Sequence, residues 1–492
     1  MYRGIEKESL RIDSSGMLAQ TPHPLALGSA LMHPQITTDF CETQLELITG
    51  VHPTAENCLA ELTDIHRFVW SSLGDELIWP ASMPCKLPPP DQIPIGQYGT
   101  SNKGMTKTVY RRGLANRYGP VMQTISGIHY NFSVDNAVFA ALGITTAAAR
   151  TDAYFSLIRN FRRYSWLLIY LFGASPAICR SFGSAQQTGL EPIGEGSLHL
   201  PWATSLRMGP LGYTSDAQRQ IHVSFNNLEA YAASIRQALS TRHPPYSKIG
   251  TLVDGEYRQL TDTLIQIENE FYGTIRPKRP LKPAERPLTA LFDRGVGYIE
   301  VRCMDLNPFL PVGINTTVMR FLDVFLLYCL LAPSPEDSPT ESARLHANQV
   351  AVVQRGREPG LTLDLGNGPE PLAKLAVVLL DACKPIASWL DSVSEGEAYA
   401  ASVSAQRPCI ANPDLTPSAK VLKKIRDGQS FFEVVMAEAQ DQRDWFKTRA
   451  PTTNESLEWS ARARQSLADQ QNLEASENID FATHLATYLR VP

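Results

Sequence analysis

The 492-residue chain contains no apolar run long enough to cross a membrane. Its two most apolar stretches, 166–172 and 321–332, are far shorter than the roughly 20 apolar residues that a spanning helix needs, and the second contains Asp323. Both stretches therefore predict buried helices. The first ten residues hold four charged side chains in place of an apolar signal sequence, so we expect no secretion signal and a cytoplasmic protein.

An excess of basic charge is also missing, because 45 Lys and Arg residues face 50 Asp and Glu residues and the net charge is -5. Proteins that bind nucleic acid or membrane surfaces need a concentrated positive field, so neither partner is expected. The eight cysteines are scattered, without a CxxC motif or the dense spacing of a secreted disulfide scaffold. We expect reduced, mostly buried thiols in a globular chain that is 43% hydrophobic.

The glycine motifs that commonly hold nucleotides are absent. The segment 99–104 is followed by Met105 and Thr106, where a P-loop would require Lys and then Ser or Thr. No GxGxxG sequence opens a strand-helix-strand unit either. Any nucleotide must therefore be held by other elements of the fold.

Three short segments alternate between apolar and polar residues, which is the period of a strand that buries one face. The polar faces carry Glu6 and Glu8 in 5–12, His129 and Asn131 in 126–133, and Tyr298, Glu300 and Arg302 in 298–302. A fourth segment, 37–49, is predicted to begin as a turn and end as a strand, and it adds Asp39 and Glu46. Each segment alone also fits a structural interpretation: a charged edge strand, a structural histidine, an ion pair or a solvated face.

Together the four segments indicate more than any one of them. A sheet that presents Glu6, Glu8, Glu46, His129 and Glu300 on one face has an excess of negative charge that divalent cations relieve. Several hard cations beside an arginine suit a triphosphate. The residues alone therefore predict Mg²⁺-dependent phosphoryl transfer, with the nucleotide held by the sheet and its metals.

Helical periodicity alternates with these strand-like segments. It is clear over 59–73, over 372–390 and from Thr416, where Thr-Pro predicts a helix N-cap and a first helical residue. An α+β fold is therefore expected. From about residue 440 large apolar side chains become sparse, so 437–492 is predicted to be a polar, partly helical C-terminal tail.

Longer stretches of the sequence resemble one family of enzymes. They are RGIEKESLR at 3–11, ITTDF at 36–40, WPASMPC at 79–85, QTISGIHYNFS at 123–133 and YIEVR at 298–302, among others. On these stretches the chain resembles the proteobacterial glutamate-cysteine ligases of type 1. The resemblance implies a single catalytic domain over 1–436 with a glutamine-synthetase-like fold. That fold is a curved antiparallel sheet with helices on its outer face and the active site in the concavity.

The activity that the resemblance implies is the first step of glutathione biosynthesis. The γ-carboxylate of L-glutamate takes the γ-phosphoryl group of ATP, and the amine of L-cysteine attacks the resulting γ-glutamyl phosphate. Mg²⁺, as more than one ion, is the implied cofactor and ATP the co-substrate. Two alternatives stay open: a related ligase that joins glutamate to a different amine, and a catalytically dead relative that only binds. We expect a monomer or a weak oligomer.

The resemblance also implies site residues, position by position. The implied metal ligands are Glu6, Glu8, Asp39, Glu46, His129 and Glu300. Arg302 is the implied catalytic residue, which steadies the transferring phosphoryl group or an oxyanion. The implied substrate-binding residues are Phe40, Tyr110, Leu114, Gln123, Tyr213 and Tyr272 around the cysteine side chain, Arg207 at a substrate carboxylate, and Asn131.

Two parts of the sequence fit this pattern less clearly. The basic run of Arg276, Lys278 and Arg279 suits either a phosphate or carboxylate contact or an exposed charged loop. The family pattern also places a helical segment ahead of 3–11. We therefore expect the strand that carries Glu6 and Glu8 to be prone to fraying, because terminal strands are ordered only when other elements hold them.

Overall fold

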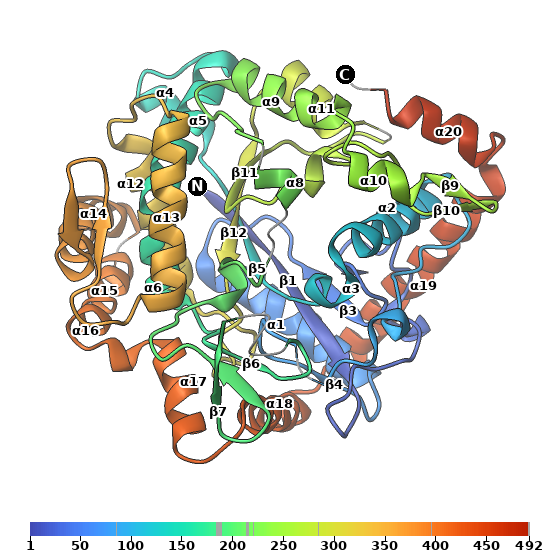
Figure 1. Ribbon diagram of the computed structural model, residues 1–492, viewed down its shortest axis with the longest axis horizontal. Helices are drawn as coiled ribbons and strands as arrows, with labels where there is room; N and C mark the ends of the chain where they lie inside the picture. Colours follow the sequence, from blue (N-terminus) through green and yellow to red (C-terminus); the bar gives the residue numbers. More distant parts are fainter. Residues whose placement is uncertain are drawn as a thin grey trace.

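The computed structural model describes residues 1–84, 86–183, 189–212, 216–219, 221–283, 285–394 and 396–490. A seven-stranded sheet crosses the centre of the molecule in the order β11-β12-β5-β1-β3-β2, with β4 paired to the end of β1 (Figure 1). Its strands are β1 (Tyr2–Ile12), β2 (Ile36–Thr38), β3 (Gln44–Ile48), β4 (Leu77–Ile78), β5 (Ile128–Ser133), β11 (Ile275–Lys278) and β12 (Tyr298–Met304). All these pairings are antiparallel. The mixed helix and sheet fold is confirmed, whereas a curvature like that of glutamine synthetase stays a prediction.

Smaller sheets and many helices surround the central sheet. The small strands are β6 (Ala177–Cys179), β7 (Glu191–Ile193), β8 (Ser197–His199), β9 (Leu252–Val253), β10 (Glu256–Tyr257), β13 (Thr362–Asp364) and β14 (Pro369–Pro371). The helices are α1 (Ala55–Ser72), α2 (Asn102–Tyr118), α3 (Pro120–Gln123), α4 (Asn136–Ala141), α5 (Ala147–Tyr164), α6 (Trp166–Phe172), α8 (Asp216–Arg219), α9 (Leu228–Ser240), α10 (Pro244–Ile249), α11 (Pro287–Arg294), α12 (Thr316–Leu331), α13 (Pro339–Arg355), α14 (Leu372–Ser394), α15 (Ala398–Ser404), α16 (Arg407–Ala411), α17 (Pro417–Arg426), α18 (Phe431–Lys447), α19 (Thr453–Ser476) and α20 (Phe481–Tyr488). Five short 3₁₀ helices are η1 (Leu25–Leu27), η2 (Pro90–Gln92), η3 (Leu206–Met208), η4 (Glu268–Glu270) and η5 (Pro413–Leu415).

The strand register brings the predicted polar faces together. Glu6 on β1 lies opposite His129 on β5, and Glu8 lies opposite Glu46 on β3. Glu300 on β12 lies opposite Asn131 on β5. Because side chains alternate across a strand, these polar residues share one face while Ile5, Tyr130 and Val301 are buried on the other.

The buried face of the sheet packs against α1, α5 and α12, which form a hydrophobic core with it. Helix α1 begins at an N-cap, where the Thr54 side chain accepts a hydrogen bond from the Asn57 amide. The apolar helix predicted at 166–172 is α6, and the one predicted at 321–332 is the second part of α12. The helix predicted over 372–390 lies within α14. Thr416 caps α17 as predicted. A short strand, β2, was not expected ahead of the turn in 37–49.

Strand β1 is held in place rather than frayed, contrary to our expectation. It pairs with β5 from Tyr2 onward and with β3 from Glu6 onward. Behind it, Arg3 and Asp323 form an ion pair at 3.0 Å whose side chains are fully buried. The Tyr130 hydroxyl donates to the same Asp323 carboxylate at 2.7 Å. The carboxylates on the opposite face therefore stand on a strand that is fixed on both edges and from behind.

The C-terminal segment 437–492 is more helical and more closely packed than expected. The Trp459 ring on α19 is buried and stacks on Phe68 of α1, with ring centroids 5.3 Å apart. The Ser29 amide donates to the Ser466 hydroxyl of α19 at 2.9 Å. The boundary at 436 between a catalytic domain and a tail stays a prediction.

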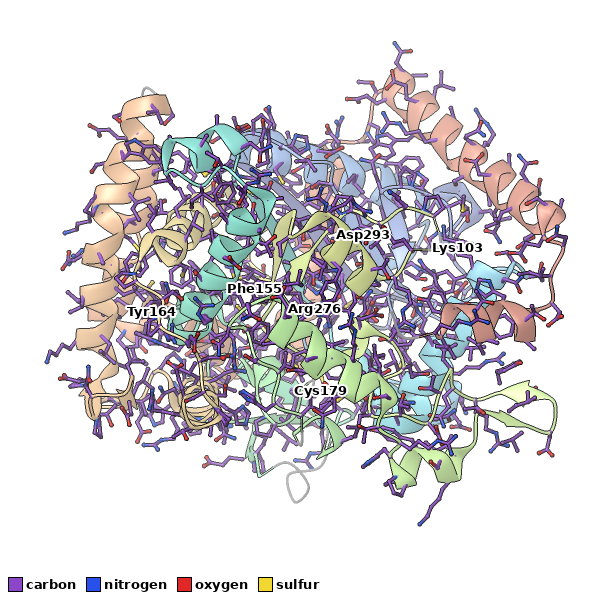
Figure 2. All side chains as sticks on the ribbon, turned by 90° about the horizontal axis from the view of Figure 1, so that it is seen from above. Lys103, Phe155, Tyr164, Cys179, Arg276 and Asp293 are labelled. Atoms are coloured by element: carbon purple, nitrogen blue, oxygen red, sulfur yellow. The ribbon has the colours of Figure 1, made fainter. Side chains whose placement is uncertain are left out.

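Most cysteines match the expected reduced state. Cys41, Cys58, Cys303, Cys329 and Cys383 are buried free thiols, and Cys409 is a partly buried one. Cys179, labelled in Figure 2, is disulfide-bonded, so the expectation of reduced thiols is wrong at this residue. Cys85 lies outside the described residues. Within the described chain, no helix is both long and apolar enough to span a membrane.

Candidate active site

Glu6, His129 and Glu300 form a compact cluster on the polar face of the sheet. The Nδ1 atom of His129 lies 3.1 Å from Glu6 Oε2 and 3.9 Å from Glu300 Oε1. One potential ligand atom from each residue lies within 4.8 Å of the others. Burial and the nearby Arg302 lower the pKa of His129, so its ring is neutral at pH 7 and can offer a nitrogen to a metal.

Three cations surround the Glu300 carboxylate. Lys278 Nζ lies 2.9 Å from it, Arg302 Nη1 3.1 Å and Arg276 Nη1 3.7 Å. Burial alone would raise the pKa of Glu300, but these cations outweigh it and hold that pKa well below its ordinary value. Arg276, near the centre of Figure 2, is buried, so the alternative of an exposed basic loop is wrong for this residue. At Glu300 these three side chains already balance the negative charge. The sequence predicted divalent cations alone in that role.

A second group of acids, Glu8, Asp39 and Glu46, lies next to the first. Burial and the charge of Asp39 raise the pKa of Glu8 to about 8. Burial and the charges of Glu6, Asp39 and Glu8 raise the pKa of Glu46 well above its ordinary value. Among the described residues, no lysine or arginine lies within 4.0 Å of these three carboxylates. The charges of Arg207 and Arg302 lower the pKa of Glu8, and that of Lys107 lowers the pKa of Glu46, but burial and the crowded like charges outweigh them.

Both groups fit hard divalent cations. Their donors are mostly carboxylate oxygens, which Mg²⁺ and Mn²⁺ prefer, with a single imidazole. The Asn131 amide donates to Glu6 Oε1 at 2.9 Å, while its own Oδ1 is buried with no hydrogen-bond partner in the described structure. Asn131 thus orients a carboxylate and leaves one polar atom for a further partner.

The predicted cysteine-pocket residues lie partly together. The Gln123 amide donates to the Tyr272 hydroxyl at 3.0 Å. Phe40 and Leu114 are buried in one hydrophobic cluster, against which Tyr110 packs. Tyr213 lies outside the described residues. These side chains offer apolar and aromatic surface beside a few polar atoms, which suits a small amino-acid side chain.

Arg207 contacts the backbone of two segments that carry site residues. Its Nη2 donates to the backbone carbonyl of Arg302 at 2.9 Å, and its Nη1 lies 3.6 Å from Asp305. The guanidinium packs against Gly127, where an added Cβ would come within 2.0 Å of Nη2. Glycine is therefore required at 127, because a side chain would displace the arginine. The Gly127 amide in turn donates to Glu8 Oε2 at 2.7 Å.

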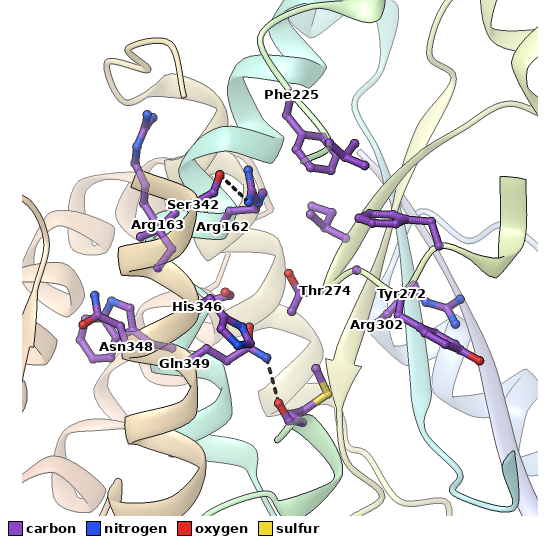
Figure 3. Close-up of a pocket in the computed structure, with 18 of the residues that line it drawn as sticks. Arg162, Arg163, Phe225, Tyr272, Thr274, Arg302, Ser342, His346, Asn348 and Gln349 are labelled. Atoms are coloured by element: carbon purple, nitrogen blue, oxygen red, sulfur yellow. Dashed lines mark hydrogen bonds between the residues drawn. The ribbon is translucent and has the colours of Figure 1, made fainter. Parts of the chain in front are cut away.

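A cavity of about 270 Å³ opens beside Arg302, and Tyr272, Thr274 and Arg207 also line it. Figure 3 shows it between these residues and helix α13, which contributes Ser342, His346 and Gln349. At the other end of the same strands lies a larger cavity of about 520 Å³, lined by Tyr2 and Ser133 with Arg150, Arg279 and Arg294. Along β12, Glu300 lies between Gly297, which lines the larger cavity, and Arg302, which lines the smaller one.

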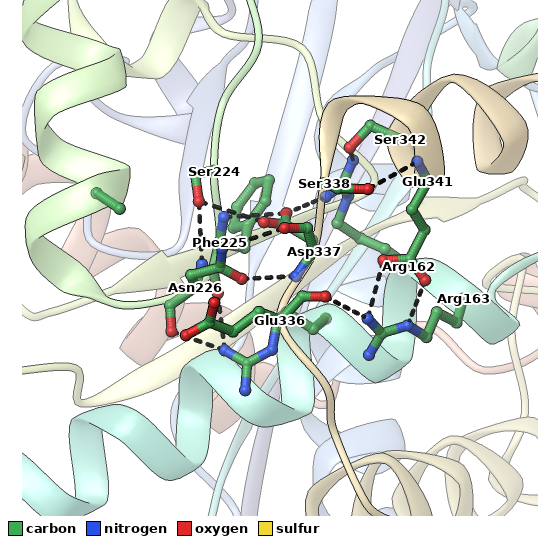
Figure 4. A network of polar contacts seen from close by, with 12 residues as sticks. Arg162, Arg163, Ser224, Phe225, Asn226, Glu336, Asp337, Ser338, Glu341 and Ser342 are labelled. Carbon is green, nitrogen blue, oxygen red and sulfur yellow. Dashed lines mark hydrogen bonds and ion pairs between the residues drawn. The ribbon is translucent and has the colours of Figure 1, made fainter.

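The α13 wall of the smaller cavity is fixed to α5 by ion pairs. Arg162 lies 3.0 Å from Asp337, and Arg163 lies 2.7 Å from Glu341 at the start of α13 (Figure 4). Asp337 also accepts a hydrogen bond from the Phe225 amide at 3.2 Å. These contacts join three segments that are far apart in the sequence, so the cavity has a rigid outer wall.

Sequence reasoning missed the basic face of α2. The Lys107 charge acts on Glu46, and burial lowers the pKa of Lys107 to about 8. Arg111 donates to the backbone carbonyls of Asp39 and Thr38, the latter at 3.3 Å. With Tyr110 and Leu114 these residues recur at 107, 110, 111 and 114, the spacing of one helix face. That periodicity was visible in the sequence.

Comparisons with known proteins agree on one family. Residues 1–352 match the family described as glutamate-cysteine ligase. The glutamate-cysteine ligase of Pseudomonas aeruginosa strain LESB58 is 47% identical over 492 residues, covering 99% of this chain and 93% of the relative. That of Saccharophagus degradans is 46% identical over 500 residues, covering 100% and 94%. The crystal structure of the Francisella tularensis glutamate-cysteine ligase in complex with AMP aligns with a TM-score of 0.94 at 34% identity, covering 99% of this chain and 97% of that one. The bifunctional glutathione synthetase of Pasteurella multocida aligns with a TM-score of 0.74 at 25% identity, covering 94% of this chain and 56% of that one.

Proposed function

The chain belongs to the glutamate-cysteine ligase family, and we propose that the polar face of its central sheet is the catalytic site of that reaction. The enzyme joins L-glutamate to L-cysteine with ATP as co-substrate, a step of glutathione biosynthesis. One observation carries the site assignment. Two groups of acidic residues stand side by side on the polar face of the central sheet, one on β1, β5 and β12 and the other on β1, β3 and the loop before β3, with Arg302 beside Glu300.

We assign a divalent cation to each group of acids: Glu6, His129 and Glu300 for one, and Glu8, Asp39 and Glu46 for the other. The raised pKa values in the second group support this, since a cation would remove the repulsion that causes them. Mg²⁺ bound at these positions would neutralise the phosphates of ATP.

The remaining side chains orient the groups of the site and stabilise negative charge. Phosphorylation turns the γ-carboxylate of glutamate into an acyl phosphate, and the cysteine amine then forms the amide bond as phosphate leaves. Arg302 is placed to meet negative charge on the transferring phosphoryl group and on the tetrahedral oxyanion. Lys278 and Arg276 hold Glu300 in position, because both lie within 4.0 Å of its carboxylate.

The two cavities let the amino acids and the nucleotide reach the acidic cluster from opposite sides. In phosphoryl transfer the attacking and leaving oxygens lie roughly in line on either side of the phosphorus. The smaller cavity, with Arg302, Arg207 and Tyr272, suits amino acids. The larger one, with Arg150 and Arg279, suits the rest of the nucleotide. The donor and the acceptor would then meet at the acidic cluster.

Phe40, Tyr110, Leu114, Gln123 and Tyr272 are our proposed cysteine pocket. The cluster of Phe40, Leu114 and Tyr110 and the Gln123 to Tyr272 hydrogen bond support a pocket for a small, polarizable side chain. We place the enzyme in the cytoplasm and expect the curved sheet of glutamine synthetase. A monomeric or weakly oligomeric state and the lack of nucleic-acid or membrane partners stay predictions.

Metal binding tests the two-cation assignment directly. Free Mn²⁺ is titrated by electron paramagnetic resonance against the wild type, Glu6→Gln, Glu8→Gln and the control Glu458→Gln, whose side chain is exposed on α19. We expect two bound ions in the wild type and the control, with one of them weakened in each site variant. Both site variants should lose ligation without a fall in their melting temperatures. Unchanged Mn²⁺ binding in both would refute the assignment.

A second pair of variants tests which cavity binds which substrate. Arg279→Ala should raise the KM for ATP and leave the KM for glutamate unchanged, because Arg279 lines the larger cavity. Tyr272→Phe removes the hydroxyl that Gln123 contacts, so it should raise the KM for cysteine more than that for glutamate or ATP. Initial rates at varied substrate concentrations give these values. The reverse pattern would exchange the two cavities.

A further inference from the structure

Helix α2 carries four residues that face the site, yet its own sequence is poorly suited to a helix. Its first turn contains no acidic residue and includes Lys103 and Gly104. Lys103, Lys107 and Arg111 repeat at four-residue spacing, so like charges stack along one face. A positive charge in the first turn also opposes the helix dipole. Its own N-cap is the Ser101 hydroxyl, which accepts the Gly104 amide at 3.1 Å, so contacts from elsewhere add to a helix whose own charges are unfavourable.

The C-terminal segment supplies the missing negative charge. Both carboxylate oxygens of Glu477 accept the amide of Asn102, the first residue of α2, at 2.8 and 2.6 Å. Glu474 accepts the Thr100 amide at 2.9 Å. The Asn102 side chain donates to the backbone carbonyl of Ile479 at 3.0 Å. Glu477, just past the end of α19, thus holds the first amide of a helix that is more than 350 positions away in the sequence, and Glu474 holds the backbone just ahead of its N-cap.

Helix α20 strengthens the same contact. Its residues Phe481 and Leu485 pack in one hydrophobic cluster with Val109 of α2 and with Leu260. The Phe481 ring also meets the Tyr257 ring edge-on, with centroids 4.9 Å apart. In Figure 1, α20 lies beside α2 at the outer edge of the molecule, and α19 leads toward it. The opposite side of α2 presents Lys107, Tyr110 and Arg111 to the site.

We propose that Glu474 and Glu477 are positioning residues of the ligase reaction. They act through α2: they fix its first turn, and so set the positions of Tyr110 in the cysteine pocket and of Arg111 against the Asp39 carbonyl. The C-terminal segment then contributes to the reaction through α2. This inference rests on the cysteine pocket of the proposed function.

The test compares Glu477→Gln and the double variant Glu474→Gln/Glu477→Gln with Glu458→Gln, an exposed glutamate of α19 outside the contact. Glutamine keeps the shape of the side chain and loses its charge. Amide hydrogen exchange of 102–118 should speed up by about five-fold in the double variant, and the KM for cysteine should rise by a similar factor. Exchange in β1 and β5 should match the wild type. The control should behave as the wild type in both measurements.

A rescue separates positioning from general stability. Lys103 is exposed, and Lys103→Glu places a carboxylate in the first turn of α2 itself. In the Glu477→Gln background it should return both the exchange of α2 and the KM for cysteine toward wild-type values. Failure of rescue while Lys103→Glu alone is active would overturn the proposal.

The two proposals fail in different ways. Unchanged exchange of α2 in the double variant would show that the carboxylates do not hold the helix, and would overturn this inference. Faster exchange with an unchanged KM for cysteine would also overturn it, because α2 would move without consequence for the substrate. If Tyr272→Phe also leaves that KM unchanged, the cysteine pocket of the proposed function is wrong as well.

Discussion

Lys7 is buried and has no acidic partner among the described residues, and replacing it should change how stability depends on pH. It lies on β1 between Glu6 and Glu8 but points to the helix side of the sheet, where it is 1% exposed. Its Nζ donates to Ser9 Oγ and to His66 Nε2, each at 2.9 Å. His66 accepts there because its Nδ1 hydrogen is used by the Leu62 carbonyl at 2.7 Å. Burial lowers the pKa of Lys7 from 10.5 to about 7.

The lowered pKa of Lys7 determines whether stability rises or falls with pH. Between pH 7 and 10.5 the unfolded chain holds a proton on Lys7 that the folded protein has released, so folding is favoured as the pH rises through this range. Below pH 7 both states are protonated and the full cost of burying the charge is present. That cost is about 5 kcal/mol, since each pKa unit corresponds to about 1.4 kcal/mol.

The variant Lys7→Met removes the charge and keeps a side chain of similar length. It leaves His66 Nε2 without a donor, which costs about 1–3 kcal/mol at every pH. The unfolding free energy of the wild type relative to this variant should therefore rise by about 4 kcal/mol between pH 6.5 and pH 10. Urea unfolding followed by circular dichroism at intervals of half a pH unit gives the curve.

The exposed lysine at 248 is the matched control, and Lys248→Met should stay parallel to the wild type across the range. Other groups that titrate between pH 6.5 and 10 cancel in the difference between the two proteins. Ligase activity at pH 8 should survive in Lys7→Met, because the side chain points away from the acidic face. Parallel curves for Lys7→Met and the wild type would refute the reasoning and show that the ammonium group stays charged when buried.

Three further variants test the two faces of the sheet. Asp323→Asn leaves the Arg3 guanidinium buried without its anion, so urea unfolding at pH 7 should show a loss of about 3–5 kcal/mol; a loss below 1 kcal/mol would contradict the account of this pair. Arg302→Lys keeps the charge and loses the planar guanidinium, so initial rates should show a large fall in kcat with little change in the KM for ATP. An effect on KM alone would assign Arg302 to ground-state binding. Glu46→Gln removes one of the crowded carboxylates, so the apo protein should unfold at higher urea at pH 8 and lose ligase activity, and lower stability would show that the charges do not repel there.

Local patterns predicted the strands that build the site and not the contacts that tune it. Alternation located β1, β5 and β12 because a strand with one buried face has a period of two in any sequence. The cations around Glu300 were only half recognised, since Arg276 and Lys278 were also read as an exposed loop. Their role follows from the pairing of β11 with β12, which places Arg276 opposite Glu300. Pairing partners are set by the whole fold and are not visible in either segment alone.

The rear face of β1 was hidden for a related reason. Arg3 and Lys7 are charged, and no pattern in the sequence predicted what they contact on that side. The structure buries both, and the partner of Arg3 lies 320 residues away in α12. The C-terminal segment was undervalued in the same way, because few apolar residues suggested weak packing. Its main contact with α2 consists of carboxylates on backbone amides, which hydrophobic patterns do not detect.

The two faces of β1 have different roles. On the rear face each buried charge has a specific partner or a measurable cost, so substitutions there change stability and leave the reacting groups in place. On the front face Glu8 and Glu46 are crowded like charges, which lowers the stability of the free protein and suits the cation that we propose there. Protein functions often require such locally unfavourable arrangements, which the rest of the fold must offset. The buried Arg3–Asp323 pair and strand pairing on both edges therefore let one strand carry two adjacent carboxylates without fraying.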